Sequence, residues 1–82
     1  MVKIIIEIDG YPFFELRKRS VESIDLMDTQ MKFDDHCSKY GIGDGSLRVF
    51  YSVVKLKYLA PDIYVVNSDG EIMGEGYIKE IK

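Results

Sequence analysis

Residues 63–82, IYVVNSDGEIMGEGYIKEIK, contain the clearest hairpin signal in this chain of 82 residues. Segments 63–66 and 71–82 have the composition of strands, and Asn67-Ser68-Asp69-Gly70 lies between them. Asp-Gly pairs supply the positive-φ residues of tight turns, so this stretch predicts an antiparallel hairpin. Gly74 and Gly76 lie in its second arm, where they predict a β-bulge or the close approach of another backbone.

The N-terminal segment predicts a second hairpin. Apolar residues alternate along positions 2–8, which is the period-two pattern of a strand with one apolar face. Asp9-Gly10-Tyr11-Pro12 predicts a turn, after which residues 13–19 continue as a strand with Phe14 and Leu16 facing inward. The hairpin is the preferred prediction; because Pro12 also fits the first turn of a helix, a helix over 13–19 stays open as the alternative.

The middle of the chain predicts one helix that begins at Ser20 or Ser23 and ends before Gly41. Its apolar residues form two rows, and its remaining side, which includes His36, is expected to face water. Two apolar rows give the helix a wider apolar surface than packing on one sheet face requires. Either a loop or the curvature of the sheet covers the second row, or that row binds a partner. The rows are Ile24, Met27 and Met31, and Leu26, Phe33, Cys37 and Tyr40.

Residues 47–59 predict a strand because Val and aromatic residues are frequent in them. Their apolar pattern changes parity at Val53–Val54, which predicts a β-bulge or two short strands, and a helix capped by Ser46 stays open. With the two hairpins and the helix, this gives a single compact α+β domain over 1–82. The predicted order is ββαβββ, with one helix packed on a mainly antiparallel sheet.

The composition is that of an ordinary globular domain, with 46% apolar and 30% charged residues and a net charge of −3. The longest apolar stretch, Ile4–Ile6, is far too short for a membrane span, and no signal peptide is recognised, so a cytoplasmic protein is expected. The single cysteine, Cys37, excludes an internal disulfide. One cysteine and one histidine cannot by themselves complete a structural zinc site, so no metal or cofactor is expected.

Two motifs resemble reaction centres, and neither satisfies the geometry that the chemistry needs. Asp34-Asp35-His36-Cys37 has the residue types of a metal or nucleophile site, but neighbours on a helix point about 100° apart and do not converge. An exposed His36 and a packed Cys37 are expected instead. The glycine-rich segment 41–45 has the helix before it rather than after it, and Asp44 would repel phosphate. We therefore expect no catalytic residues and no enzyme activity.

The leading functional hypothesis is a small stoichiometric protein-interaction module that inhibits or regulates a larger protein or complex, or that self-associates. Compact proteins of this size are common among virus-encoded inhibitors, including anti-defence proteins, so this type is favoured. Interfaces concentrate binding energy in a few aromatic anchors. The candidate anchors are Phe33 and Tyr40 on the helix and Tyr51 and Tyr58 on the sheet.

The alternative is a module for RNA or single-stranded nucleic acid that uses a basic and aromatic sheet face. Aromatic side chains stack on bases, while cations contact phosphates. The scattered basic residues and the slightly negative net charge make this the second choice. Its candidate residues are Arg17, Arg19, Arg48, Lys55 and Lys57.

Overall fold

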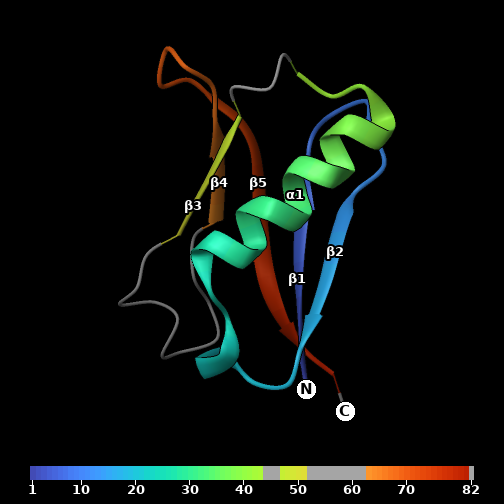
Figure 1. Cartoon of the computed structure of the whole chain (residues 1–82), viewed down its shortest axis with the longest axis vertical. Coiled ribbons are helices and arrows are strands. Elements are labelled where there is room, and N and C mark those ends of the chain that lie inside the picture. The colour runs from blue at the N-terminus through green and yellow to red at the C-terminus, as the bar shows by residue number, and fades with distance from the viewer. Residues whose placement is uncertain (44–46, 52–62, 82) are drawn as a thin grey trace.

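The computed structural model describes residues 1–43, 47–51 and 63–81, which form one helix packed on a five-stranded antiparallel sheet. The sheet order is β2-β1-β5-β4-β3, and α1 lies across one of its faces, in contact with β2 and β3 (Figure 1). The predicted α+β class and element order are confirmed. The elements are β1 (Val2–Glu7), β2 (Phe14–Lys18), the short 3-10 helix η1 (Val21–Ser23), α1 (Leu26–Tyr40), β3 (Arg48–Tyr51), β4 (Ile63–Val66) and β5 (Ile72–Glu80).

Both predicted hairpins are present, and their turns use the expected residues. Gly10 has φ +85°, and the Tyr11 N–H donates to the Ile8 carbonyl at 3.1 Å, which closes the turn from β1 to β2. Gly70 has φ +82° between β4 and β5, and its N–H donates to the Asn67 carbonyl at 3.0 Å. Asp44-Gly45 and the parity change at Val53–Val54 lie outside the described residues.

The helix ends where the sequence predicts and begins later than it predicts. Gly41 takes the left-handed conformation that terminates α1, with φ +65°. Ser20 caps η1 instead of α1, and Ile24 is extended between the two helices. Asp25 caps α1 through a hydrogen bond from the Met27 N–H to its Oδ1 at 3.2 Å. The start at Ser20 or Ser23 was therefore wrong, because Ile24 packs toward the core and breaks the helical run.

The core lies between α1 and the sheet. Phe14 and Leu16 face inward from β2 as predicted, and the Phe14 ring meets Phe33 of α1 edge to face at 5.5 Å. Gln30 joins the helix to β3, because its Oε1 accepts from the Val49 N–H at 2.7 Å and its Nε2 donates to the Leu47 carbonyl at 3.2 Å. The buried core residues are Val2, Ile4, Ile6, Phe14, Phe33, Ile42, Leu47, Val49, Ile63, Val65 and Ile78.

Gly74 and Gly76 allow β1 to approach β5. A Cβ added at Gly76 would lie 2.2 Å from the Ile5 carbonyl oxygen, and one added at Gly74 would lie 2.7 Å from the Glu7 carbonyl oxygen. The pairing of β4 with β5 also shifts register between Val65 and Val66. The predictions of close approach and of a bulge in this hairpin are both confirmed.

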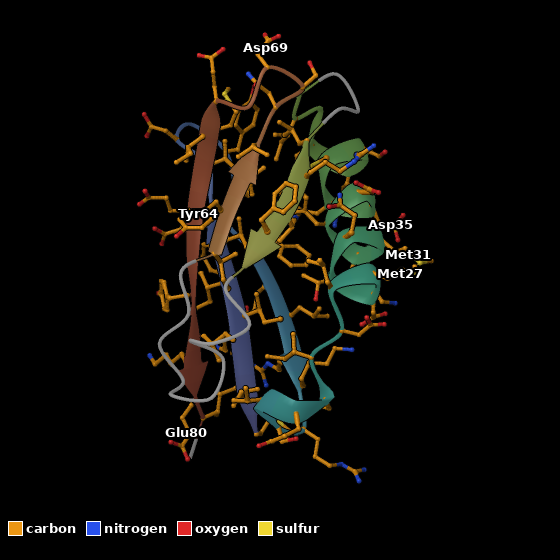
Figure 2. All side chains as sticks on the ribbon, turned by 90° about the vertical axis from the view of Figure 1, so that its left-hand side faces the viewer. Met27, Met31, Asp35, Tyr64, Asp69 and Glu80 are labelled. Atoms are coloured by element: carbon orange, nitrogen blue, oxygen red, sulfur yellow. The ribbon has the colours of Figure 1, made fainter. Side chains whose placement is uncertain are left out.

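Each of the two apolar rows is only partly buried. Ile24 of the first row and Phe33 and Cys37 of the second pack in or against the core. Leu26 and Tyr40 of the second row are exposed, and Met27 and Met31 of the first row are 72% and 61% exposed. Figure 2 shows these two methionines on the side of α1 that faces away from the sheet. No described residue covers them, so an interface role for this row stays a prediction.

Candidate partner-binding surface

The face of the sheet opposite α1 carries the second set of alternating side chains. Because successive residues of a strand point to opposite faces, the neighbours of the core residues lie on this side. Figure 2 shows Tyr64 there, on the far side of the sheet from the helix. We call this surface the open sheet face. Its described residues are Lys3, Ile5 and Glu7 on β1, Glu15 and Arg17 on β2, Arg48 and Phe50 on β3, Tyr64 and Val66 on β4, and Glu75, Tyr77 and Lys79 on β5.

The strand register aligns aromatic and aliphatic side chains in a row across this face. Phe50 lies directly opposite Tyr64, and Tyr77 lies directly opposite Ile5. Tyr64 is paired with Glu75, so Tyr77 is its diagonal neighbour, about 7–8 Å away. We call Ile5, Phe50, Tyr64 and Tyr77 the aromatic row. It crosses β1, β5, β4 and β3.

The aromatic row presents apolar surface although it lies outside the core. Phe50 is 49% exposed and Tyr77 45% exposed, while Tyr64 is half-buried and Ile5 is buried among its neighbours. Large side chains that remain this accessible on a regular sheet provide contact area at low entropic cost. The row therefore supplies the kind of residues that anchor a binding partner.

Charged residues of both signs surround the aromatic row. Lys3 Nζ lies 2.7 Å from Glu15 Oε1, and Arg17 Nε lies 3.6 Å from the same oxygen. The hydrogen bond from Lys3 and the positive charges of Lys3 and Arg17 hold the pKa of the Glu15 carboxyl below its usual value. Glu75 lies within the row itself, beside Tyr64 in the register. The surface is thus an apolar centre with a rim of mixed charge.

Of the four anchors predicted from the sequence, Phe33 is buried and Tyr40 is exposed, and the side chains of the other two lie outside the described residues. Phe33 is 1% exposed and packs in the core between α1 and the sheet. It therefore offers no surface to a partner. Tyr40 is exposed at the end of α1, with its ring 4.8 Å from His36 and 5.3 Å from Lys39 Nζ. Tyr51 belongs to β3, and its side chain is outside the described part, as is all of Tyr58.

The three described basic residues proposed for nucleic acid, Arg17, Arg19 and Arg48, do not all meet in one patch. Arg17 and Arg48 lie on the open sheet face at its two opposite edges, which four strand spacings separate by about 19 Å. Arg19 is exposed just beyond the end of β2. Lys55 and Lys57 lie outside the described residues. The aromatic row and Glu75 lie between the two placed strand cations.

The Asp34–Cys37 segment does not form a site, and one expectation about it is corrected. Asp34 accepts a hydrogen bond from Gln30 at 2.8 Å. His36 is half-buried instead of exposed, because its ring packs on Phe14 and its Nε2 lies 3.0 Å from the Pro12 carbonyl oxygen. Burial, and secondarily the Asp34 charge, raise the pKa of the Cys37 thiol. Within residues 1–43, 47–51 and 63–81, no three His, Cys, Asp or Glu side chains are grouped to hold a metal ion.

Sequence reasoning did not single out Tyr64, Tyr77 or Ile5 as surface residues. The alternation of residues along the strands could have assigned the two tyrosines to this face, since Tyr64 lies between buried Ile63 and Val65, and Tyr77 precedes buried Ile78. What was missing was the register, because only strand pairing aligns these separate positions with Phe50.

Comparison with known proteins does not assign a function to this surface. No family model, no curated protein and no solved structure matches the chain. Among the described residues, no helix has the length and apolar character needed to cross a membrane.

Proposed function

We propose that this protein is a small stoichiometric protein-interaction module, an inhibitor or regulator of a larger protein, and that the open sheet face binds the partner. The observation that carries the proposal is the aromatic row, in which Phe50 and Tyr77 remain about half exposed on a regular sheet. Tyrosine and phenylalanine are enriched in interface cores, and a polar rim typically surrounds them. The open sheet face has both features.

The charges of this face favour a protein partner over nucleic acid. A nucleic-acid surface gathers cations along the path of the phosphates. Here Lys79, Lys3 and Arg17 lie opposite one another across three strands, but Glu15 is ion-paired with both Lys3 and Arg17. Glu75 lies inside the aromatic row, and the net charge of the chain is −3. A phosphate chain crossing the row would meet carboxylates, whereas a protein partner with mixed charges would find complementary groups. Binding, without a chemical step, is the activity that this surface supports.

The test begins with affinity capture from a lysate of the source organism and identification of the captured protein by mass spectrometry. Dissociation constants are then measured for the wild type, Phe50→Ala and Tyr77→Ala. We expect each substitution to weaken binding at least about 30-fold, the equivalent of an anchor contributing about 2 kcal/mol. Met31→Ala, on the outer side of α1, is the matched control and should bind like the wild type.

Two results would overturn the proposal. In the first, Met31→Ala weakens binding while the two aromatic substitutions leave it unchanged, which would move the interface to the helix. In the second, labelled RNA or single-stranded DNA binds with submicromolar affinity that falls steeply with salt, which would establish nucleic acid as the ligand. Thermal melts of every variant show whether a loss of binding is a loss of folding.

A further inference from the structure

One edge of the sheet is complementary to a second copy of itself. β2 is the terminal strand of the sheet, and β1 is its one pairing partner in the described part of the chain (Figure 1). Half of the backbone N–H and C=O groups of an edge strand point away from the sheet, where they are able to pair with another strand. The one proline nearby, Pro12, lies before the strand and removes none of its N–H groups.

The side chains along this edge are accessible. The Arg17 side chain is 64% exposed and Glu15 is also exposed, while Leu16 between them is half-buried against the core. Among the described residues, Glu15 forms ion pairs with Lys3 and Arg17, and both use Oε1. Within that part of the chain, its second carboxylate oxygen can accept from a cation on a neighbouring strand.

We propose that β2 pairs antiparallel with β2 of a second copy, about a two-fold axis midway between the two Leu16 residues, so that two molecules share one continuous sheet. This pairing sets Glu15 of each copy opposite Arg17 of the other, because residues equally far from the axis face each other. Leu16 meets Leu16 at the axis and extends the apolar layer under the helices. The inference is independent of the proposed function.

Charge and strand length together select this register. A two-fold axis perpendicular to the sheet sets one residue of β2 opposite its own copy, since only then do facing side chains point to the same side. A register centred on Glu15 would oppose two carboxylates, and a register centred on Arg17 or Lys18 would oppose two cations. Like charges directly opposite each other are destabilising. Leu16 is also the middle residue of Phe14–Lys18, so its register pairs the whole strand.

The residues that flank β2 fit the same register. Phe13 precedes the strand, is 56% exposed, and would face Arg19 of the second copy on the open sheet face. An arginine over an aromatic ring is a favourable contact. Because the axis is perpendicular to the sheet, both α1 helices lie on one side and both aromatic rows lie on the other. A dimer of this kind would present two copies of the open sheet face on one surface.

The experiment is sedimentation of the wild type, Glu15→Arg and Arg17→Glu, alone and mixed. The wild type should rise from 9.5 kDa toward twice that mass as its concentration increases. Each variant alone opposes like charges at both symmetric pairs, so its self-association should weaken roughly tenfold or more. In the equimolar mixture, one chain carries cations at positions 15 and 17 and the other carries carboxylates at both. Both facing pairs are then of opposite charge, so the mixture should dimerise again.

Asp69→Lys is the matched control, because Asp69 is exposed in the turn between β4 and β5, away from the β2 edge. It should dimerise like the wild type. Hydrogen exchange of the wild type supplies a measurement that needs no variant to fold. Amides of residues 14–18 should become more protected as concentration rises, while those of the Asn67–Gly70 turn should not change.

A wild type that stays monomeric at every concentration reached would overturn the inference. So would a mixture of Glu15→Arg and Arg17→Glu that fails to dimerise when both variants are folded. Self-association that Tyr77→Ala abolishes and Arg17→Glu leaves intact would place the contact on the open sheet face instead. The first two results leave the test of partner binding unaffected, because that test rests on Phe50 and Tyr77; the third would show that self-association and partner binding use the same face.

Discussion

Replacing Phe33 by alanine should strongly destabilise the fold, whereas replacing Phe50 should change its stability little. The two phenylalanines are a matched pair, since Phe33 is 1% exposed beneath α1 and Phe50 is 49% exposed on the open sheet face. Phe33 also makes an edge-to-face contact with Phe14 at 5.5 Å, which joins the helix to β2. The same chemical change therefore removes a core contact in one case and a surface contact in the other.

The magnitudes separate the two variants clearly. Truncating a buried phenylalanine costs about 3–5 kcal/mol, because both its transfer free energy and the packing around it are lost. A domain of this length has a total stability of about 4–12 kcal/mol, so Phe33→Ala should remove a large part of it. Phe50 has one direct cross-strand partner, Tyr64, and such a pair contributes about 0.2–1 kcal/mol.

Thermal and urea unfolding, followed by circular dichroism, measure both effects. At about 4–8 °C per kcal/mol, Phe33→Ala should lower Tm by roughly 12–40 °C and Phe50→Ala by no more than about 8 °C. The urea midpoint should fall in parallel with little change in the m-value. A Phe33→Ala protein that melts within a few degrees of the wild type would refute the placement of Phe33 in the core and return it to the candidate surface anchors.

Three single contacts give further predictions. Gly76→Ala should lower the free energy of unfolding by about 3 kcal/mol or more, since its Cβ would lie 2.2 Å from the Ile5 carbonyl oxygen. If this variant melts at the temperature of the wild type, β1 and β5 do not approach as closely as described. The hydrogen bond from Lys18 lowers the pKa of Asp28 below its usual 3.8, so its stabilisation is present above that pH and is lost as pH falls through the lower folded value. Lys18→Met should therefore lower Tm at pH 7, and its difference from the wild type should shrink as pH falls below 3.8; a difference that does not change with pH would assign the effect to packing. Burial and a raised pKa should make Cys37 react with a thiol reagent at pH 7 more slowly in the native protein than in denaturant, and equal rates would show an accessible thiolate.

Much of the fold could be predicted because its signals are local. The Asp9-Gly10 and Asp69-Gly70 turns require positive φ, and Gly41 requires the left-handed conformation at the helix end, so each residue type marks its own position. The alternation of apolar residues in β1 and β2 assigns Phe14 to the core without knowledge of the partner strand.

The start of α1 could not be predicted from these local signals, because Ser20, Ser23 and Asp25 are all acceptable caps. The packing of Ile24 against the core decides among them. His36 was assigned to water by its helical position alone. Phe14 and the Pro12 carbonyl, which come from another part of the chain, give it a packed environment.

The sequence by itself thus determined the strands at residues 2–8, 63–66 and 71–82, the turns at Asp9-Gly10 and Asp69-Gly70, and the end of the helix, since each depends on the conformational preference of a residue or on a short period. Only the tertiary structure decided that residues 14–18 and 48–51 are strands, which residues of the two helical rows are buried, and which aromatic residues share a surface. Those outcomes depend on strand order and register, which bring Phe50, Tyr64, Tyr77 and Ile5 together from four strands. Pairing between distant segments is a property of the whole chain, and no local pattern encodes it.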